Sequence, residues 1–243
     1  MLSKKWSILI FLCLGTILLR AQEEEPKPPK PDFSFGASLI FSDPISDFAS
    51  TDIFNPDAGF AEFGAGVGIF ARFEYKSGFF IEINAEHIRR KSRIWSESID
   101  EITNILNEQD DTEQLVFVAE ENPKYRHTSL LVGPGFTFKI KNFQIYIRSE
   151  FGIAHTRMTE SKIRDNNERD YRFADSGDVL AAFGLGAGTI ISDVLRIDFS
   201  FTNFGNPDFE LATINSFGFD ETISEFNLPV QVFEVGLGIM IVK

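Results

Sequence analysis

Apolar and polar residues alternate along most of this chain, and the alternation runs longest over residues 61–85. From 61 to 75, the odd positions carry Ala, Phe, Val, Ile and Tyr, whereas the even positions carry mainly Gly, Glu and Arg. After a break at Lys76-Ser77-Gly78 the alternation resumes, with apolar odd positions set against polar neighbours such as Glu82. A period of two that a short turn interrupts predicts a long β-hairpin.

The same alternation recurs in further stretches of comparable length. Together with the hairpin, they make eight predicted strands, each long enough to cross a membrane. The further stretches lie at 33–41, 130–138, 143–153, 179–187, 195–201 and 233–241.

The connections between these strands are alternately short and long. An up-and-down barrel whose two rims face different compartments has this pattern, with short periplasmic turns and long extracellular loops. The chain is therefore predicted to be all-β, with an eight-stranded antiparallel up-and-down transmembrane β-barrel over residues 32–243. The short turns lie at 76–78, 141–142 and 192–194, and the long connections lie at 43–59, 96–124, 159–178 and 203–228.

Alternation alone leaves open which face points inward, because a soluble lipocalin-like barrel alternates as well. Three observations favour the transmembrane form. The polar face carries mainly Gly, Ser and single charges, which suits a narrow interior, and the apolar face is continuous on every strand. Aromatic residues also lie near the short-turn ends, where an aromatic girdle is expected, at Phe33, Tyr75, Phe79 and Phe143.

The first 31 residues have a different character. Lys4 and Lys5 precede an apolar run that ends before Arg20-Ala21, which predicts a secretory signal peptide over 1–21. A permanent anchor helix is the alternative, although the run is short for a bilayer. Residues 22–31 are charged and Pro-rich and predict an extended periplasmic tether, with a recognition segment for another protein as the alternative.

Charge narrows the choice of partners. The chain has a net charge of −13, and removing residues 1–21 leaves 20 Lys and Arg against 36 Asp and Glu, a net charge of −16. Such an acidic chain repels nucleic acid, so no DNA or RNA partner is predicted. The one cysteine, Cys13, leaves with the signal peptide, so neither a disulfide nor a thiolate site is expected.

The signal peptide, the eight alternating strands, the Gly-rich second strand ending in Phe73-Glu74-Tyr75 and the closing Val235-Gly236-Leu237-Gly238 resemble one family. It is the outer-membrane β-barrel domain family, which includes small porin-like and PorT-like proteins. The resemblance covers residues 32–243 and implies a place in the outer membrane of a Gram-negative bacterium. PorT-like relatives further imply a component of an export or envelope complex.

Charged residues of both signs fall on the predicted inner face. Ionised groups in a narrow interior are costly unless they are paired, so mixed signs favour a network of ion pairs that fills the lumen. A selective pore is the alternative. The predicted lumen charges are Glu62, Arg72, Glu74, Glu82, Glu86, Arg126, Arg148, Glu150, Arg196, Asp198 and Glu234.

A second group of cations falls on the outer face near the long-loop rim. Because the rest of the chain is acidic, this concentration of Arg89, Lys91, Arg93 and Arg157 leads to a hypothesis. These side chains would bind the head groups of outer-membrane lipid, lipopolysaccharide in particular, through charge-assisted hydrogen bonds. Solvated strand ends are the alternative.

No catalytic, metal or cofactor site is predicted. His87 and His155 are assigned by parity to the lipid face and His127 to the lumen, so the three do not converge on a metal. The glycine series at 64–68 and 184–188 resembles a dinucleotide loop, but it continues a strand and opens no helix. A lipid-modifying enzyme therefore lacks a catalytic set.

The long loops are the predicted place of function. The capping-box spacing at 98–101 predicts a short amphipathic helix, and a short strand is expected at 115–119. Several Phe residues between 204 and 226 would contact a partner or pack within the loops. The predicted function is a structural or interaction role in the cell envelope, in which the long loops would bind an envelope protein partner. The alternative is a narrow porin-like channel for small solutes or ions.

Overall fold

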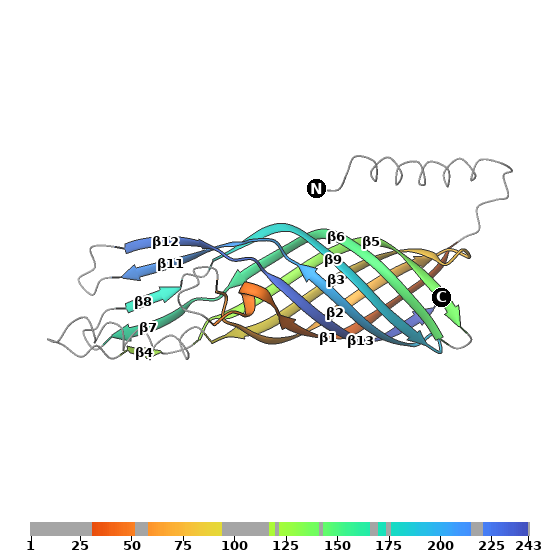
Figure 1. Cartoon of the computed structure of the whole chain (residues 1–243), viewed down its shortest axis with the longest axis horizontal. Helices are drawn as coiled ribbons and strands as arrows, with labels where there is room; N and C mark the ends of the chain where they lie inside the picture. The colour runs from red at the N-terminus through yellow and green to blue at the C-terminus, as the bar shows by residue number, and fades with distance from the viewer. Residues whose placement is uncertain are drawn as a thin grey trace. The chain divides into compact units, whose positions relative to one another are not determined.

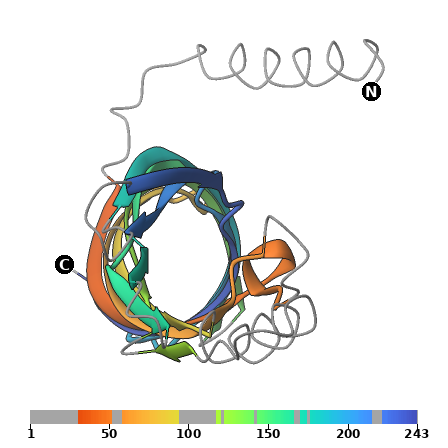
Figure 2. The same cartoon turned by 90° about the vertical axis from the view of Figure 1, so that its left-hand side faces the viewer.

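Eight long antiparallel strands close into a barrel in the computed structural model of the chain (Figures 1 and 2). Each of these strands pairs with its neighbours along the chain, and the first pairs with the last to close the ring. The predicted eight-stranded barrel is therefore confirmed. The strands, in chain order, are β1 (Asp32–Pro44), β2 (Ala61–Glu74), β3 (Phe79–Ser92), β5 (Lys124–Ile140), β6 (Phe143–Met158), β9 (Ser176–Ile191), β10 (Leu195–Asn203) and β13 (Gln231–Val242).

The structure describes most of the barrel and part of the loops. The predicted signal peptide, the tether up to residue 30 and the predicted helix after residue 98 lie outside the described residues. The described ranges are 31–51, 58–93, 117–119, 122–140, 143–165, 170–173, 176–214 and 221–242.

The barrel has an apolar outside and a polar inside. On β2, Val67 and Ile69 are 57% and 65% exposed, whereas the intervening inward positions are covered and Arg72 is only 1% exposed. A soluble barrel would reverse these faces, because exposed apolar area is costly in water. This inverted distribution is the architecture of a transmembrane β-barrel, in which the outward band meets lipid.

The outward band has the height of a bilayer core. On β6, exposed apolar positions run from Phe143 to Ile153, with Ser149 the one half-buried break. At a rise of about 3.3 Å per residue and a tilt of about 40°, this stretch covers roughly 25 Å of the barrel axis. That height equals the apolar band expected of an outer-membrane barrel.

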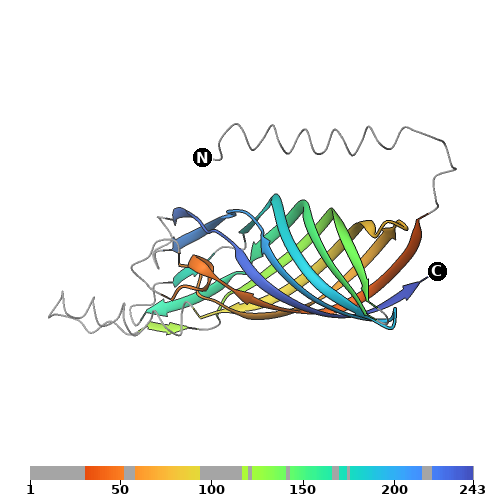
Figure 3. The ribbon, with the colours of Figure 1, turned by 45° about the vertical axis from the view of Figure 1, so that its right-hand side comes forward.

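A second, five-stranded sheet extends the barrel at its long-loop end (Figures 1 and 3). Its order is β12-β11-β8-β7-β4, and all its strands come from the long connections. The sequence predicts β4 as a short strand at 115–119 but treats the other four as loop. The strands are β4 (Phe117–Ala119), β7 (Ser161–Asp165), β8 (Asp170–Phe173), β11 (Asp208–Ile214) and β12 (Glu221–Asn227).

Helical structure in the described residues is confined to one 3-10 turn, η1 (Ser46–Ala49). Its Phe48 side chain is fully buried. Among the described residues, no helix combines the length and the apolar character needed to span a membrane.

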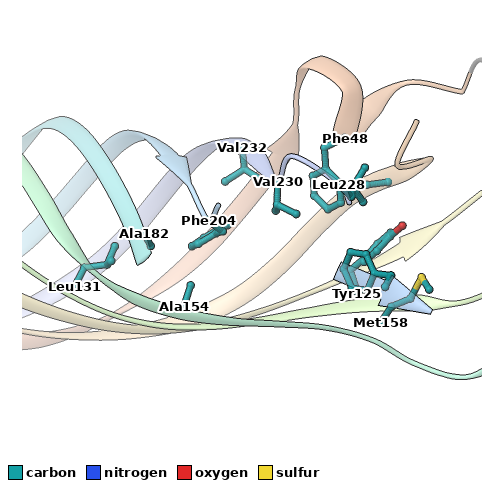
Figure 4. Packing of buried hydrophobic residues seen from close by; sticks show 12 residues of the cluster. Phe48, Tyr125, Leu131, Ala154, Met158, Ala182, Phe204, Leu228, Val230 and Val232 are labelled. Carbon is teal, nitrogen blue, oxygen red and sulfur yellow. The ribbon is translucent and has the colours of Figure 1, made fainter. Parts of the chain in front are cut away.

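Two apolar clusters lie at opposite ends of the barrel interior. The cluster at the short-turn end consists of Phe70, Phe80, Tyr146, Ile190 and Met240. The larger cluster at the long-loop end includes Phe48, Tyr125 and Phe204 (Figure 4). Between them, the interior is polar and charged, and this segment of the barrel is the candidate functional site.

Candidate functional site

Charged side chains from four strands meet inside the barrel. They are three arginines and three carboxylic acids, each at most 9% exposed, so the formal charges balance. Because inward residues alternate along each strand, each strand contributes its charges from one face. The cluster consists of Arg72 from β2, Glu82 from β3, Arg148 and Glu150 from β6, and Arg196 and Asp198 from β10.

Glu82 is the central acceptor of this cluster. Arg72 Nε donates a hydrogen bond of 2.7 Å to Glu82 Oε2. Arg196 donates to both carboxylate oxygens of Glu82, at 3.0 and 2.8 Å. Asn84 Nδ2 adds a bond of 3.1 Å to Oε1. Such bidentate, charge-assisted bonds are among the stronger side-chain interactions in proteins.

Arg148 links the remaining acids. Its guanidinium group donates to both oxygens of Asp198 and lies 3.0 Å from Glu150 Oε1. Arg196 contacts the same Asp198 carboxylate. Asp198 therefore bridges two arginines, and Glu82 bridges all three, since Arg148 Nε lies 3.7 Å from Glu82 Oε1. The six residues form one continuous network across the interior.

Aromatic rings cover the guanidinium groups. The Arg72 guanidinium carbon lies 3.9 Å from the Phe80 ring centre and 4.3 Å from that of Tyr146. Arg196 lies 4.2 Å from the ring centre of Phe70. Cation–π contacts of this kind strengthen when water is excluded. The ion network therefore rests on the apolar cluster at the short-turn end.

A layer of acids and hydroxyl groups follows toward the long-loop end. Glu234 accepts hydrogen bonds from Thr202 at 2.9 Å and from Ser42 at 3.3 Å, and Arg90 donates to Ser42 Oγ at 2.9 Å. Glu86 and Glu234 line a cavity of about 20 Å³ together with residues of the ion network. A volume of this size holds about one water molecule, not a solute.

Aromatic residues fill the interior beyond this layer. The His127 ring stacks on that of Phe204 at 5.3 Å between centres, and Phe48 packs edge-on against both His127 and Tyr125. The Tyr125 hydroxyl donates to the carbonyl oxygen of Gly59 at 2.8 Å, which holds the loop before β2 against β5. Side chains thus cross the described interior in several layers between its two ends.

The structure places most of the predicted lumen charges inside. Six form the ion network, and Glu86 and Glu234 lie in the adjoining layer. Glu74 lies at the short-turn end, where Lys139 Nζ is 2.9 Å from its Oε1. Arg126 and Glu62 lie outside the lumen, and the prediction for these two residues is wrong.

Arg126 is a correction to the sequence prediction. Its neighbours Tyr125 and His127 are 2% and 1% exposed and point inward, so Arg126 points outward. The physical reason is strand parity, because the alternation that places Leu130 outside also places Arg126 outside.

Glu62 is a second correction. The β2–β3 register shifts between Ala61 and Gly64, so the alternation of β2 is broken at this point. Glu62 consequently accepts a bond of 2.6 Å from Arg93 Nε near the surface instead of entering the lumen.

Three interior residues were not among the predicted site residues. Arg90, Asn84 and Tyr146 are at most 4% exposed and contact the charged layers. The parity of β3 contained the signal for Arg90 and Asn84, since both share the inward face of Glu82. The role of Tyr146 depends on packing across the lumen, which alternation does not reveal.

The predicted outer-face cations lie near the long-loop rim. Arg89, Lys91 and Arg157 are exposed, and Arg93 pairs with Glu62. A hollow of about 520 Å³ lies among these cations. It is lined by Arg89, Lys91, Lys124 and Arg126. The same end of the barrel thus has an aromatic interior and a cationic exterior.

Comparisons with known proteins yield similar barrels but no family. No family model matches the chain, and no curated protein matches it. Among solved structures, the outer-membrane protein OprG from Pseudomonas aeruginosa is 12% identical, with 89% of this chain and 99% of that chain covered and a TM-score of 0.48.

Two further structures are similar at the same level. Neisserial surface protein A is 11% identical, with 86% and 96% of the two chains covered and a TM-score of 0.45. Ail of Yersinia pestis, in complex with the heparin analogue sucrose octasulfate, is 13% identical, with 88% and 99% covered and a TM-score of 0.41. These likenesses assign no function to this chain, and its PorT-like kinship stays a prediction.

Proposed function

We propose that this protein is an outer-membrane barrel of a Gram-negative bacterium with a structural or interaction role in the envelope. The observation that carries the proposal is the filled interior. Between the two apolar clusters, the charged layers leave a cavity of about 20 Å³. A barrel without a solute-sized passage serves as an anchor for what it displays at its rim.

The exterior supports the membrane location. Large apolar side chains on all eight barrel strands are exposed, and they form a band about as tall as a bilayer core. By the usual orientation of such barrels, the short turns would face the periplasm and the long connections the outside. The predicted signal peptide agrees with export to this membrane.

The five-stranded sheet supports an interaction role. Among the described strands, β12 and β4 each pair on one side only and form its two edges. An exposed strand edge offers backbone N–H and C=O groups to a strand from another protein. We therefore assign partner binding to this sheet, with β12 as the longer of its two edges.

Photo-crosslinking in intact cells tests this assignment. A crosslinking residue in place of Thr222 or Ser224 of β12 is expected to give discrete protein adducts. The same residue in place of Ser77, in the short turn, serves as the control and should give different adducts or none. Absence of adducts from β12, or the same adducts from Ser77, would contradict the interaction role.

A narrow channel is the second candidate. The charged network favours it, because charged side chains of both signs line conducting pores as well. Conduction would require the bonds between Arg148, Arg196 and their acids to open, since they cross the interior. Conductance measurements separate the two candidates.

A further inference from the structure

We propose that cations on the outer face of β3, β5 and β6 bind the phosphate groups of a membrane lipid head group. This inference rests on the membrane location in the proposed function and names the lipid class that the rim would bind. It concerns the outside of the barrel and is independent of whether the interior conducts.

The cations form rows across three adjacent strands. Arg89 of β3 is directly opposite Arg126 of β5, and Arg126 is directly opposite Arg157 of β6. One row further toward the rim, Lys91 is directly opposite Lys124. Five positive charges therefore lie on one patch of the outer surface, which we call the cationic rows.

The register places like charges side by side on these strands. Like charges directly opposite each other on neighbouring strands destabilise a sheet, and Arg126 has an arginine on both sides. A bound phosphate would offset the repulsion through charge-assisted hydrogen bonds, for which arginine has suitable geometry.

The surface between the rows is hollow. Arg89, Lys91, Lys124 and Arg126 line the depression of about 520 Å³, which also reaches Phe63 and Glu62. The Glu62 carboxylate accepts the bond from Arg93, so its charge is offset by a sixth cation. The Arg89 side chain is anchored by its Nε, which donates to His87 Nε2 at 3.1 Å. The hollow is therefore a cationic site large enough for a phosphate group.

The height of the cationic rows identifies lipid as the source of the phosphate. On β5 and β6, the exposed apolar band ends at Leu130 and Ile153, which are directly opposite each other. One outward position further lie Thr128 and His155, and the next outward position is the Arg126 row. Cations that begin two outward positions above the edge of an apolar band lie at the level of lipid head groups.

Lipid retention tests the proposal with matched variants. The full-length mature protein is reconstituted into nanodiscs of phosphatidylcholine with and without bis-phosphorylated lipid A. Retained lipid A is then measured by native mass spectrometry. The test variant is Arg126→Gln/Arg157→Gln. The control is Lys76→Gln/Lys139→Gln, which removes the same charge at the short-turn end.

The test variant should bind lipid A roughly 10- to 30-fold more weakly than the wild type, because two contacts to the head group are lost and each contributes about 1 kcal/mol. The control should stay within about twofold of the wild type. Equal retention by both variants would overturn the proposal. Displacement of lipid A by an equal concentration of inorganic phosphate would assign the site to free anions and overturn the lipid source.

Thermal stability gives a second readout, because the effect of removing a cation on the unfolding temperature should depend on whether lipid A is present. Without lipid A, the single variant Arg126→Gln should unfold at the same temperature as the wild type or higher, because repulsion is relieved. With lipid A, it should unfold at a lower temperature than the wild type. A variant that is less stable in both lipids by the same amount would contradict the proposal. A conducting barrel that still retained lipid A would contradict only the proposed function.

Discussion

Glu82 is the residue on which the charged interior depends most. It accepts bonds from Arg72, Arg196 and Asn84 while it is completely buried. Burying charges costs several kcal/mol per ion, and an ion network compensates this cost only when each member keeps its partners. Loss of this one carboxylate would leave two buried guanidinium groups short of an acceptor.

We expect Glu82→Gln to lower the free energy of unfolding by about 3–5 kcal/mol, since the change removes one partner of a buried network. Urea unfolding of the reconstituted barrel, followed by circular dichroism, measures the effect. Lys139→Gln is the control, because its pair with Glu74 is 58% exposed at the lysine, and it should cost less than about 1 kcal/mol. Equal effects of the two changes would refute the ranking.

Part of this network could be predicted from the sequence. The turn at 76–78 fixes the register of the hairpin, and that register places Arg72 directly opposite Glu82. The bonds from Arg196 to Glu82 come from a strand that is not a neighbour of β3 in the sheet. Such pairs across the lumen depend on barrel closure and strand stagger, which the alternation of one sequence does not specify.

At the scale of the elements, the eight strands of the barrel wall could be predicted from the sequence, whereas four of the five strands of the second sheet could not. The barrel strands meet lipid on one face, so their sequences alternate over long stretches. The register of β1 with β2, for example, runs without interruption from Asp32 to Ser42. The strands β7, β8, β11 and β12 lie beyond the apolar band, where neither face must be apolar. Their sequences alternate over about four residues at most, as in Asp170–Phe173 of β8, which is too short to stand out from a loop.

The inner face also depends on small residues where strands and side chains approach closely. A Cβ atom on Gly133 would lie 1.7 Å from the carbonyl oxygen of Ser149 on β6, whereas a Cβ atom on Gly184 would have its nearest contact at 3.5 Å. The first position has no room for a methyl group, and the second has ordinary contact distance. Glycine is thus required at the first position but not at the second.

Gly133→Ala is expected to impair barrel formation, because the β5–β6 pair would have to separate to admit the new methyl group. The folded fraction, read from the heat-dependent shift in gel mobility, should fall at least severalfold. Gly184→Ala is the matched control and should fold like the wild type. If both variants fold equally well, β5 and β6 do not lie as close together in this region as described.

At the scale of the whole molecule, the wall, the interior and the long-loop end of the barrel differ in the chemistry that they present. The wall carries an apolar band toward lipid, the interior is closed by ion pairs and aromatic rings, and the long-loop end carries the second sheet. On the proposed function, this filled interior makes the barrel a base for what it displays at its rim. The two places in the described residues that we propose to bind other molecules are the sheet edges and the cationic rows, both at the long-loop end of the barrel.

Single-channel conductance in a planar bilayer tests the closed interior most directly. The purified wild-type protein is measured in molar potassium chloride, with its folded state verified by the gel shift. A general porin in the same bilayer shows that opening steps are detectable. The account predicts no conductance steps above the leak of the bare bilayer. Stable, ohmic steps from the folded wild-type protein would contradict the closed interior and establish the narrow channel instead.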